Sequence, residues 1–232
     1  MIIGAGGSLL TAVLRPCTSH PPTHPAHRPR LIYHQDRRIT MKFHYNGKYD
    51  GNADALPTRE HEEGYVPFKE PDEKKMMIVL NVIALFITVP LVILVDMISG
   101  YRLSWELWVA LIAFILSIFP HEVLHALCFK GDVYMYTYLS KGACFVVGPE
   151  LMTKRRFVFM CMLPNIVFGF IPFIVWLIFP NLTFFGYLGA FAIGAGGGDY
   201  MNVFNCLTQV PTGAKTYMHG MNSFWVKTDK EI

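Results

Sequence analysis

The sequence predicts an all-α membrane protein with about four transmembrane helices and a short cytoplasmic β-hairpin between helices two and three. Hydrophobic residues make up 53% of the 232 residues and charged residues only 16%, which is unusual for a soluble domain. Four apolar stretches also reach the roughly 20 residues that a spanning helix needs. They run from Met76 to Ser99, from Ser104 to Leu127, from Phe157 to Phe179 and from Leu182 to Phe204.

The chain before the first apolar stretch divides into two polar parts. Residues 16–29 interleave five prolines with three histidines and show no apolar periodicity, so this segment cannot bury a core. We expect residues 1–40 to be disordered or to be an upstream extension of the gene model, because Met41 is a plausible start of its own. Residues 41–75 mix acidic residues with lysines and are expected to form a polar cytoplasmic arm.

Lysine and arginine residues predict the orientation of the four-helix membrane domain, residues 76–206. From Lys69 onward, 11 of them lie before the first stretch, between the second and third, or after the fourth, whereas the other two connections hold only Arg102. Basic residues concentrate on the cytoplasmic side of membrane proteins. We therefore expect a multi-pass protein of the cell membrane with both termini cytoplasmic and a cytoplasmic tail over residues 207–232. A net charge of +3 is too small to indicate nucleic-acid binding.

The connection between the second and third stretches predicts a β-hairpin. Val133 to Tyr138 and Cys144 to Val147 are β-prone runs, and residues 139–143 between them include a glycine. Such a hairpin can offer an edge strand to which an unwound substrate segment adds by β-pairing. The alternative is a hairpin that only covers the site.

The second stretch contains the motif His121-Glu122-Val123-Leu124-His125 near its cytoplasmic end. Histidines four residues apart lie on one face of a helix, so both imidazoles can reach a single Zn²⁺. Glu122 lies one residue round the helix and can act as a base on water without binding the ion. A charged group inside an apolar span costs roughly 2.5–3.5 kcal/mol at the bilayer centre and usually marks function. The alternative is polar packing between helices.

A catalytic zinc site has three protein ligands and one open position, so a third ligand is required. Depth in the membrane favours Asp199, which lies 17 residues from the start of its stretch, as His121 does from the start of the second. The glycine-rich run over residues 194–198 allows close helix approach. The alternative is that Asp199 pairs with a lysine or with water. The candidates in or beside the stretches are Asp96, Glu106, Glu150, Asp199 and His219, of which Asp96 and Glu106 fall near the opposite membrane surface.

Asn165 follows Pro164 in the third stretch. Its amide can hydrogen-bond the backbone of a substrate or a helix carbonyl that the proline leaves without a donor. We treat Asn165 as a candidate substrate-positioning residue, although the structural role is the favoured interpretation.

Several segments together carry a resemblance to a known family: the His121–His125 motif, Lys141–Cys144, Pro164, Gly198-Asp199 and His219–Trp225. They resemble the putative zincin peptidases, a family of small membrane proteins distantly similar to the site-2 proteases. The resemblance covers about residues 70–228. It implies a helical membrane core in which two histidines and one aspartate bind zinc, the aspartate being Asp199.

The sequence therefore predicts a membrane-embedded zinc metalloprotease that hydrolyses peptide bonds of membrane or membrane-proximal proteins. Glu122 is the expected base, and His121, His125 and Asp199 are the expected zinc ligands. The expected partners are a membrane-protein or peptide substrate and the lipid bilayer. One alternative is a non-proteolytic metal-binding membrane protein such as a transporter, although transporters usually place ligands near the midplane of several spans. The other is an inactive protease-like scaffold, which would not need Glu122.

Overall fold

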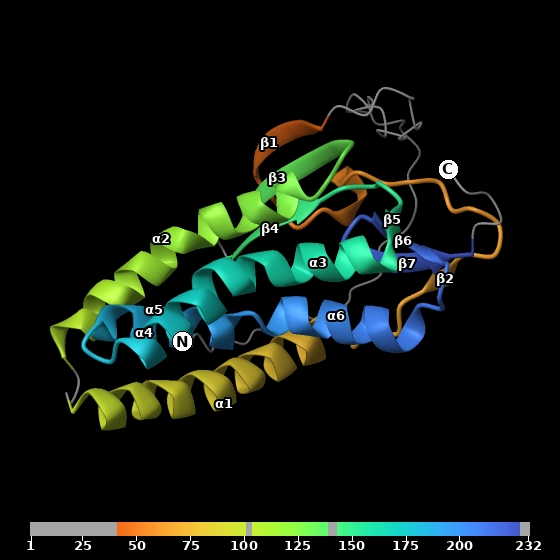
Figure 1. Ribbon diagram of the computed structural model, residues 1–232. Helices are drawn as coiled ribbons and strands as arrows, with labels where there is room; N and C mark the ends of the chain where they lie inside the picture. Colours follow the sequence, from red (N-terminus) through yellow and green to blue (C-terminus); the bar gives the residue numbers. More distant parts are fainter. Residues whose placement is uncertain (1–40, 101–103, 139–142, 228–232) are drawn as a thin grey trace, which may run out of the picture.

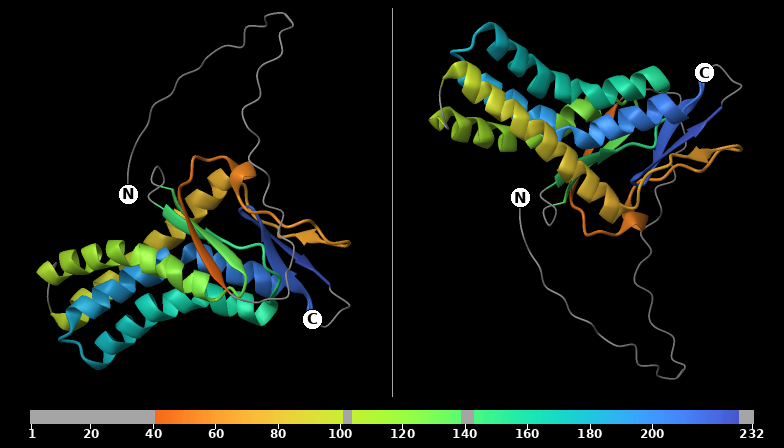
Figure 2. Two further views of the ribbon diagram at one scale, coloured as in Figure 1. Left: turned by 90° about the horizontal axis from the view of Figure 1, so that it is seen from above. Right: turned by 90° about the horizontal axis from the view of Figure 1, so that it is seen from below.

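Two β-sheets gather at one end of an elongated set of helices, as Figures 1 and 2 show. The computed structural model describes residues 41–100, 104–138 and 143–227. The helices are α1 (Glu73–Ser99), α2 (Trp105–Leu127), α3 (Lys154–Pro164), α4 (Ile171–Ile178), α5 (Thr183–Ala195) and α6 (Gly197–Gln209). The strands are β1 (Lys42–Lys48), β2 (Val66–Pro67), β3 (Asp132–Tyr138), β4 (Ala143–Val147), β5 (Met152–Thr153), β6 (Lys215–His219) and β7 (Asn222–Val226).

The fold is mixed α/β, so the prediction of an all-α protein is wrong. Within the described residues, one sheet has the strand order β1-β3-β4 and the other has the order β2-β7-β6-β5. The segment expected to be a polar arm supplies one strand to each sheet, since β1 runs parallel to β3 and β2 pairs with β7. The segment expected to be a tail supplies β6 and β7 to the four-stranded sheet. β2 and β5 are two residues long each, which is too short for an alternating apolar pattern to show in the sequence.

The hairpin expected between the second and third apolar stretches is confirmed. β3 and β4 pair antiparallel with Tyr136 opposite Phe145, while residues 139–142 lie outside the described part of the chain. Val133 and Met135 of β3 and Val147 of β4 are fully buried. Among the strands that the structure describes, β4 pairs with β3 alone, so its other edge is open.

In the described part of the chain, three helices are long and apolar enough to cross a membrane: 75–99, 105–127 and 154–178. The last of these joins α3 to α4 through a π-helical segment, Asn165–Phe170, which begins directly after Pro164. The fourth predicted stretch is not one helix, because it breaks at Gly196 into α5 and α6. About four spanning helices were expected, and the structure corrects this to three long helices and the short apolar α5.

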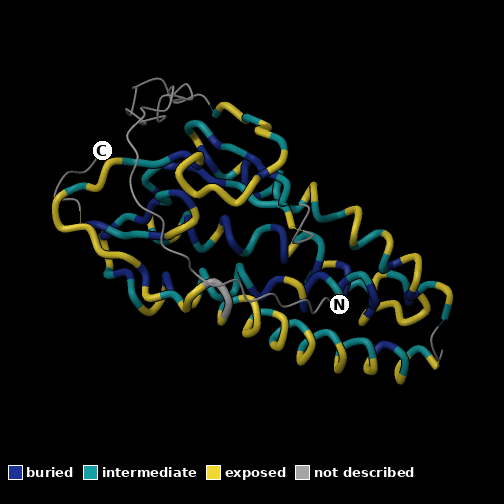
Figure 3. Tube along the Cα trace, turned by 180° about the vertical axis from the view of Figure 1, so that it is seen from behind, coloured by how far each residue is buried: buried dark blue, intermediate teal, exposed yellow. Residues whose placement is uncertain are grey.

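α1 has defined ends and two different faces. The Asp72 side chain caps its start by accepting a hydrogen bond from the Lys75 backbone N–H at 3.0 Å, and Gly100 ends it in the left-handed conformation at φ 68°. One face packs on α5. The other leaves large apolar side chains exposed, among them Phe86 at 74% and Met97 at 76%, and the exposure continues along the helix in Figure 3. Extended apolar surfaces of this kind are typical of contact with lipid or with a partner.

Glycine at position 194 lets α5 approach α1 closely. A Cβ atom there would overlap Thr88 Oγ1 and lie 3.1 Å from the Ala84 carbonyl oxygen. We expect Gly194→Ala to lower the free energy of unfolding by about 1–3 kcal/mol, because the two helices must move apart. Thermal unfolding of the purified protein measures this loss. Gly198→Ala is the matched control, since the nearest atom to its added Cβ, Leu80 Cδ1, is 4.0 Å away. An equal loss in both variants would contradict the prediction.

Candidate metal centre

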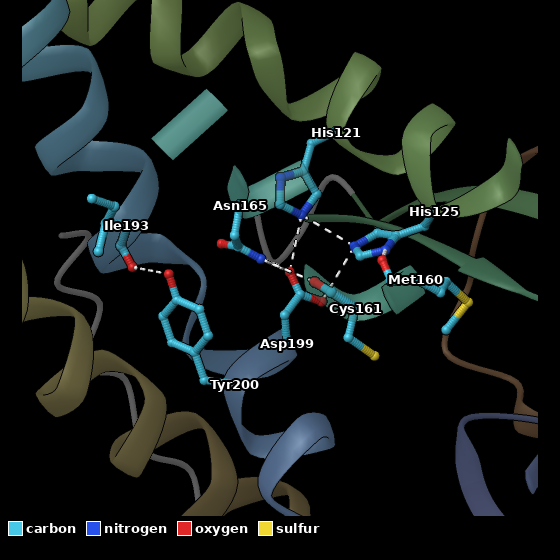
Figure 4. A network of polar contacts seen from close by, with 8 residues as sticks. All are labelled: His121, His125, Met160, Cys161, Asn165, Ile193, Asp199 and Tyr200. Atoms are coloured by element: carbon cyan, nitrogen blue, oxygen red, sulfur yellow. Dashed lines mark hydrogen bonds and ion pairs between the residues drawn. The ribbon is translucent and has the colours of Figure 1, made fainter. Parts of the chain in front are cut away.

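The last two turns of α2 bring His121 and His125 together. Their Nε2 atoms lie 3.2 Å apart, as Figure 4 shows. His125 is buried, and its Nδ1–H donates to the Met160 carbonyl oxygen of α3 at 2.9 Å. Because a carbonyl oxygen only accepts, this bond places the proton on Nδ1 and leaves the Nε2 lone pair directed at His121 and Asp199.

Asp199 comes from the first turn of α6 and meets both histidines. Its Oδ2 lies 3.2 Å from His121 Nε2, and its Oδ1 lies 3.2 Å from His125 Nε2. The break at Gly196 starts a new helix just before the aspartate, so the carboxylate lies at a helix N-terminus, where the helix dipole favours negative charge. The Tyr200 hydroxyl donates to the Ile193 carbonyl oxygen at 3.0 Å and so links the two sides of the break.

The spacing of these three side chains fits a zinc ion. Zinc binds histidine nitrogens and carboxylate oxygens at about 2.0–2.2 Å in a tetrahedral arrangement, so two ligand atoms on one ion are about 3.3–3.5 Å apart. His121 Nε2 lies 3.2 Å from His125 Nε2 and from Asp199 Oδ2, and His125 Nε2 lies 3.2 Å from the other carboxylate oxygen, Asp199 Oδ1. The three residues therefore supply the donor types and the spacing that such an ion requires, and they leave its fourth position for water or substrate.

Asn165 contacts Asp199. Its side chain is 1% exposed, and its Nδ2 donates to Asp199 Oδ2 at 2.6 Å and to the Cys161 carbonyl oxygen at 3.2 Å. A Cβ atom at Gly196 would overlap Asn165 Oδ1, so this position needs glycine. The structure places Asn165 against the candidate ligand Asp199 and a helix carbonyl. Whether it positions a substrate or serves the structure stays a prediction.

We expect Asn165→Ala to weaken zinc binding by roughly 10–100-fold, the usual effect of losing a hydrogen bond that orients a metal ligand. Competition against a chelating dye measures this affinity. Asn205→Ala is the matched control, because Asn205 is also a buried asparagine but accepts from Gln209 on α6. Unchanged zinc affinity in Asn165→Ala would mean that Asn165 serves another role, such as contact with a substrate.

Glu122 lies beside the three ligand candidates and faces a cavity. Ligand atoms of His121, Glu122 and His125 all lie within 4.8 Å of one another, so these residues form a group that could hold a metal ion. Glu122 also lines a cavity of about 210 Å³ together with His125 and Asp199. On the strand β4, burial and the Glu122 charge raise the pKa of the Cys144 thiol to about 11.

The other ligand candidates from the sequence are engaged elsewhere. Asp96 accepts a hydrogen bond from the Tyr187 hydroxyl. Glu150 accepts from the backbone N–H groups of residues 130 and 131 and from Arg156. The Nδ1–H of His219 donates to the Arg59 carbonyl oxygen at 2.8 Å. Of the candidates whose contacts are described, Asp199 is the one that meets the two histidines.

The segment that carries this geometry matches a known family. Residues 114–215 fit the family described as "Putative zincin peptidase". This match covers less than half of the chain. The matched segment contains His121, Glu122, His125, Asn165 and Asp199, and over residues 114–215 it confirms the resemblance to the putative zincin peptidases. The expected distant similarity to the site-2 proteases stays a prediction. No curated protein and no solved structure matches the chain.

Two parts of the candidate site have little signal in the sequence. The Met160 carbonyl that orients His125 is a backbone group, and any residue type supplies one. The other part is the β6–β7 hairpin, whose residues Met218, Met221 and Ser223 line the cavity. The β-prone runs Thr216–Met218 and Phe224–Val226, on the two sides of the Gly220 turn, could have indicated this hairpin.

Proposed function

We propose that this protein is a membrane-embedded zinc metallopeptidase that hydrolyses peptide bonds of membrane or membrane-proximal proteins. The observation that carries the proposal is the arrangement of His121, His125 and Asp199 at mutual distances of 3.2 Å with Glu122 beside them. The zincin peptidase family supports the same reaction class. Three long apolar helices with large exposed apolar side chains support the membrane location.

The roles of the side chains follow from their positions. His121, His125 and Asp199 would hold zinc, which when bound supplies Lewis-acid polarisation and lowers the pKa of water. Glu122 takes a proton from the attacking water and delivers it to the leaving amine nitrogen. Met160 and Asn165 hold His125 and Asp199 in place through hydrogen bonds. The entropy cost of orienting His125 and Asp199 is therefore met during folding, before a substrate arrives.

The open edge of β4 is the proposed place for the substrate backbone. Phe145, Val146 and Val147 of this strand line the cavity, and so does Glu122. An extended segment paired to this edge would have its main chain fixed beside the base. A peptide backbone is a suitable partner because an edge strand offers unpaired N–H and C=O groups.

The proposed topology has both termini in the cytoplasm. The sheets, the basic residues and the metal centre would then lie on the cytoplasmic side, which follows from the distribution of Lys and Arg around the apolar stretches. A reporter that is active only outside the cytoplasm should give no signal when fused after Ile232 and a signal when inserted at residue 102. Activity of the fusion at the carboxyl terminus would overturn this topology.

The test of the proposed function is a comparison of membrane-protein fragments in cells that make the native protein or Glu122→Gln. We expect fragments that accumulate only with the native protein, because the variant keeps the metal ligands but lacks the base. Identical fragment patterns at equal protein levels would contradict the proposal.

A further inference from the structure

The cavity beside the candidate metal centre has a wall built by the segment that follows the family region. The family match ends at residue 215, where β6 begins. Met218, Met221 and Ser223 of the β6–β7 hairpin nevertheless line the same cavity as Glu122 and Asp199. The reacting groups lie inside the family region of the sequence, and this wall follows it. Residues of the wall can therefore contact a substrate side chain without taking part in the reaction.

This hairpin is held rigidly. β6 pairs with β5 and β7 pairs with β2, so both of its edges are occupied. Its turn is also tied to the amino-terminal segment, because the Gly220 N–H donates to the Pro57 carbonyl oxygen at 3.1 Å and His219 donates to Arg59. Met221 in the turn is 49% exposed. The wall is therefore preformed, and Met221 can be replaced without removing a buried core residue.

The rest of the cavity lining is also largely apolar. Phe157 and Met160 come from α3, and Phe145 comes from β4. An apolar cavity of about 150 Å³ is large enough to bind benzene, and this cavity measures about 210 Å³. Methionine side chains adapt to different apolar shapes. An acidic side chain would lose its hydration there without gaining a partner of opposite charge, because the carboxylates of Glu122 and Asp199 line the cavity beside the ligand candidate His125.

We propose that the β6–β7 hairpin forms one side of a specificity pocket that takes a large apolar side chain, aromatic or branched aliphatic, of the substrate residue next to the scissile bond. This inference rests on the proposed peptidase function and names the class of substrate. It assigns selection to Met218 and Met221, whereas His121, Glu122, His125 and Asp199 carry the reaction. Met221 is the residue to vary, because it is at the turn and half-exposed.

The experiment uses the full-length purified protein, loaded with zinc in detergent micelles, and peptides that are identical except for Phe, Leu, Ala or Asp at one position. Mass spectrometry locates the cleaved bonds, and kcat/KM is measured for each peptide. We expect Phe and Leu beside the cleaved bond to exceed Ala by about 10-fold or more, the usual selectivity of an apolar pocket. Asp at this position should prevent cleavage there. Met221→Trp should lower the ratio of Phe to Ala, and Met221→Ala should preserve or raise it.

Two controls separate the possible failures. Met97→Trp places the same bulk on an exposed part of α1 and should leave the ratio unchanged. Zinc content and thermal unfolding show that each variant is folded. If cleavage depends on Glu122 but the ratio of Phe to Ala is the same in the native protein, Met221→Trp and Met221→Ala, the pocket assignment is wrong and the peptidase function stands. If no peptide is cleaved in a Glu122-dependent way, the proposed function fails and the pocket assignment fails with it.

Discussion

Purified Glu122→Gln should bind one zinc ion per chain, unfold at the same temperature as the native protein, and lose peptidase activity by about 10²–10⁴-fold. A positioned general acid–base contributes a factor of this size. Glutamine keeps the shape of the side chain but cannot accept the proton from water. The metal ligands and the Met160 and Asn165 hydrogen bonds are untouched by the change. Zinc analysis, thermal unfolding and peptide hydrolysis on one preparation provide the three readouts.

Glu150→Gln is the matched control for this first prediction. Glu150, between β4 and β5, is also a partly buried carboxylate. It accepts hydrogen bonds from Arg156 and from the backbone at residues 130 and 131. Its replacement is expected to reduce stability without removing the base. Retained activity in Glu122→Gln, or loss of zinc from it, would contradict the role assigned to Glu122.

Asp199→Ala and His125→Ala should lose zinc and, with it, the stability that the ion provides. Structural zinc sites in small peptides are worth about 10–16 kcal/mol, so removal of one of three ligands lowers the affinity by orders of magnitude. A ligand at 1,000 times its Kd stabilises the folded state by about 4 kcal/mol. EDTA should therefore lower the unfolding temperature of the native protein but leave that of Asp199→Ala unchanged.

Asp96→Ala provides the comparison for the aspartate variant. Asp96 lies on α1, and its carboxylate accepts a hydrogen bond from the Tyr187 hydroxyl. Tyr187 packs in a hydrophobic cluster that contains none of the three ligand candidates. We expect this variant to lose stability but to keep both zinc and the response to EDTA. Full zinc occupancy in Asp199→Ala would mean that the third ligand is another residue, and Glu122, whose ligand atom lies within 4.8 Å of those of both histidines, would then be the first candidate.

Several elements of the fold were predictable because their signal is local. Hydropathy over windows of about 20 residues indicates α1, α2 and the joined α3–α4. β-propensity on both sides of a glycine-containing turn indicates the β3–β4 hairpin. Helical periodicity alone places His121 and His125 on one face, and comparison of depth from the outer ends of two stretches brings Asp199 to the same level, where the structure has it.

The sheets were not predictable in the same way because their pairing is long-range. β1 pairs with β3 across about 90 residues, and its sequence contains lysines, an asparagine and a glycine that suggest a polar arm. The break at Gly196 was obscured by averaging, since a hydropathy window covers both α5 and α6 even though the glycine-rich run weakens the helix locally. The contact of Asn165 with Asp199 depends on how two helices pack, which the local sequence does not state.

The pairing of β2 with β7 has a consequence for the timing of biosynthesis. Val66 lies opposite Trp225, so the four-stranded sheet can close only after β7 has left the ribosome. Translation proceeds at about 5–20 residues per second, so β2 waits on the order of ten seconds for its partner. During that interval α1 and α2 can already be inserted, whereas Asp199 and the β6–β7 wall are still missing. The proposed peptidase activity requires Asp199, so the order of synthesis would delay this activity until α6 and the β6–β7 hairpin have been made.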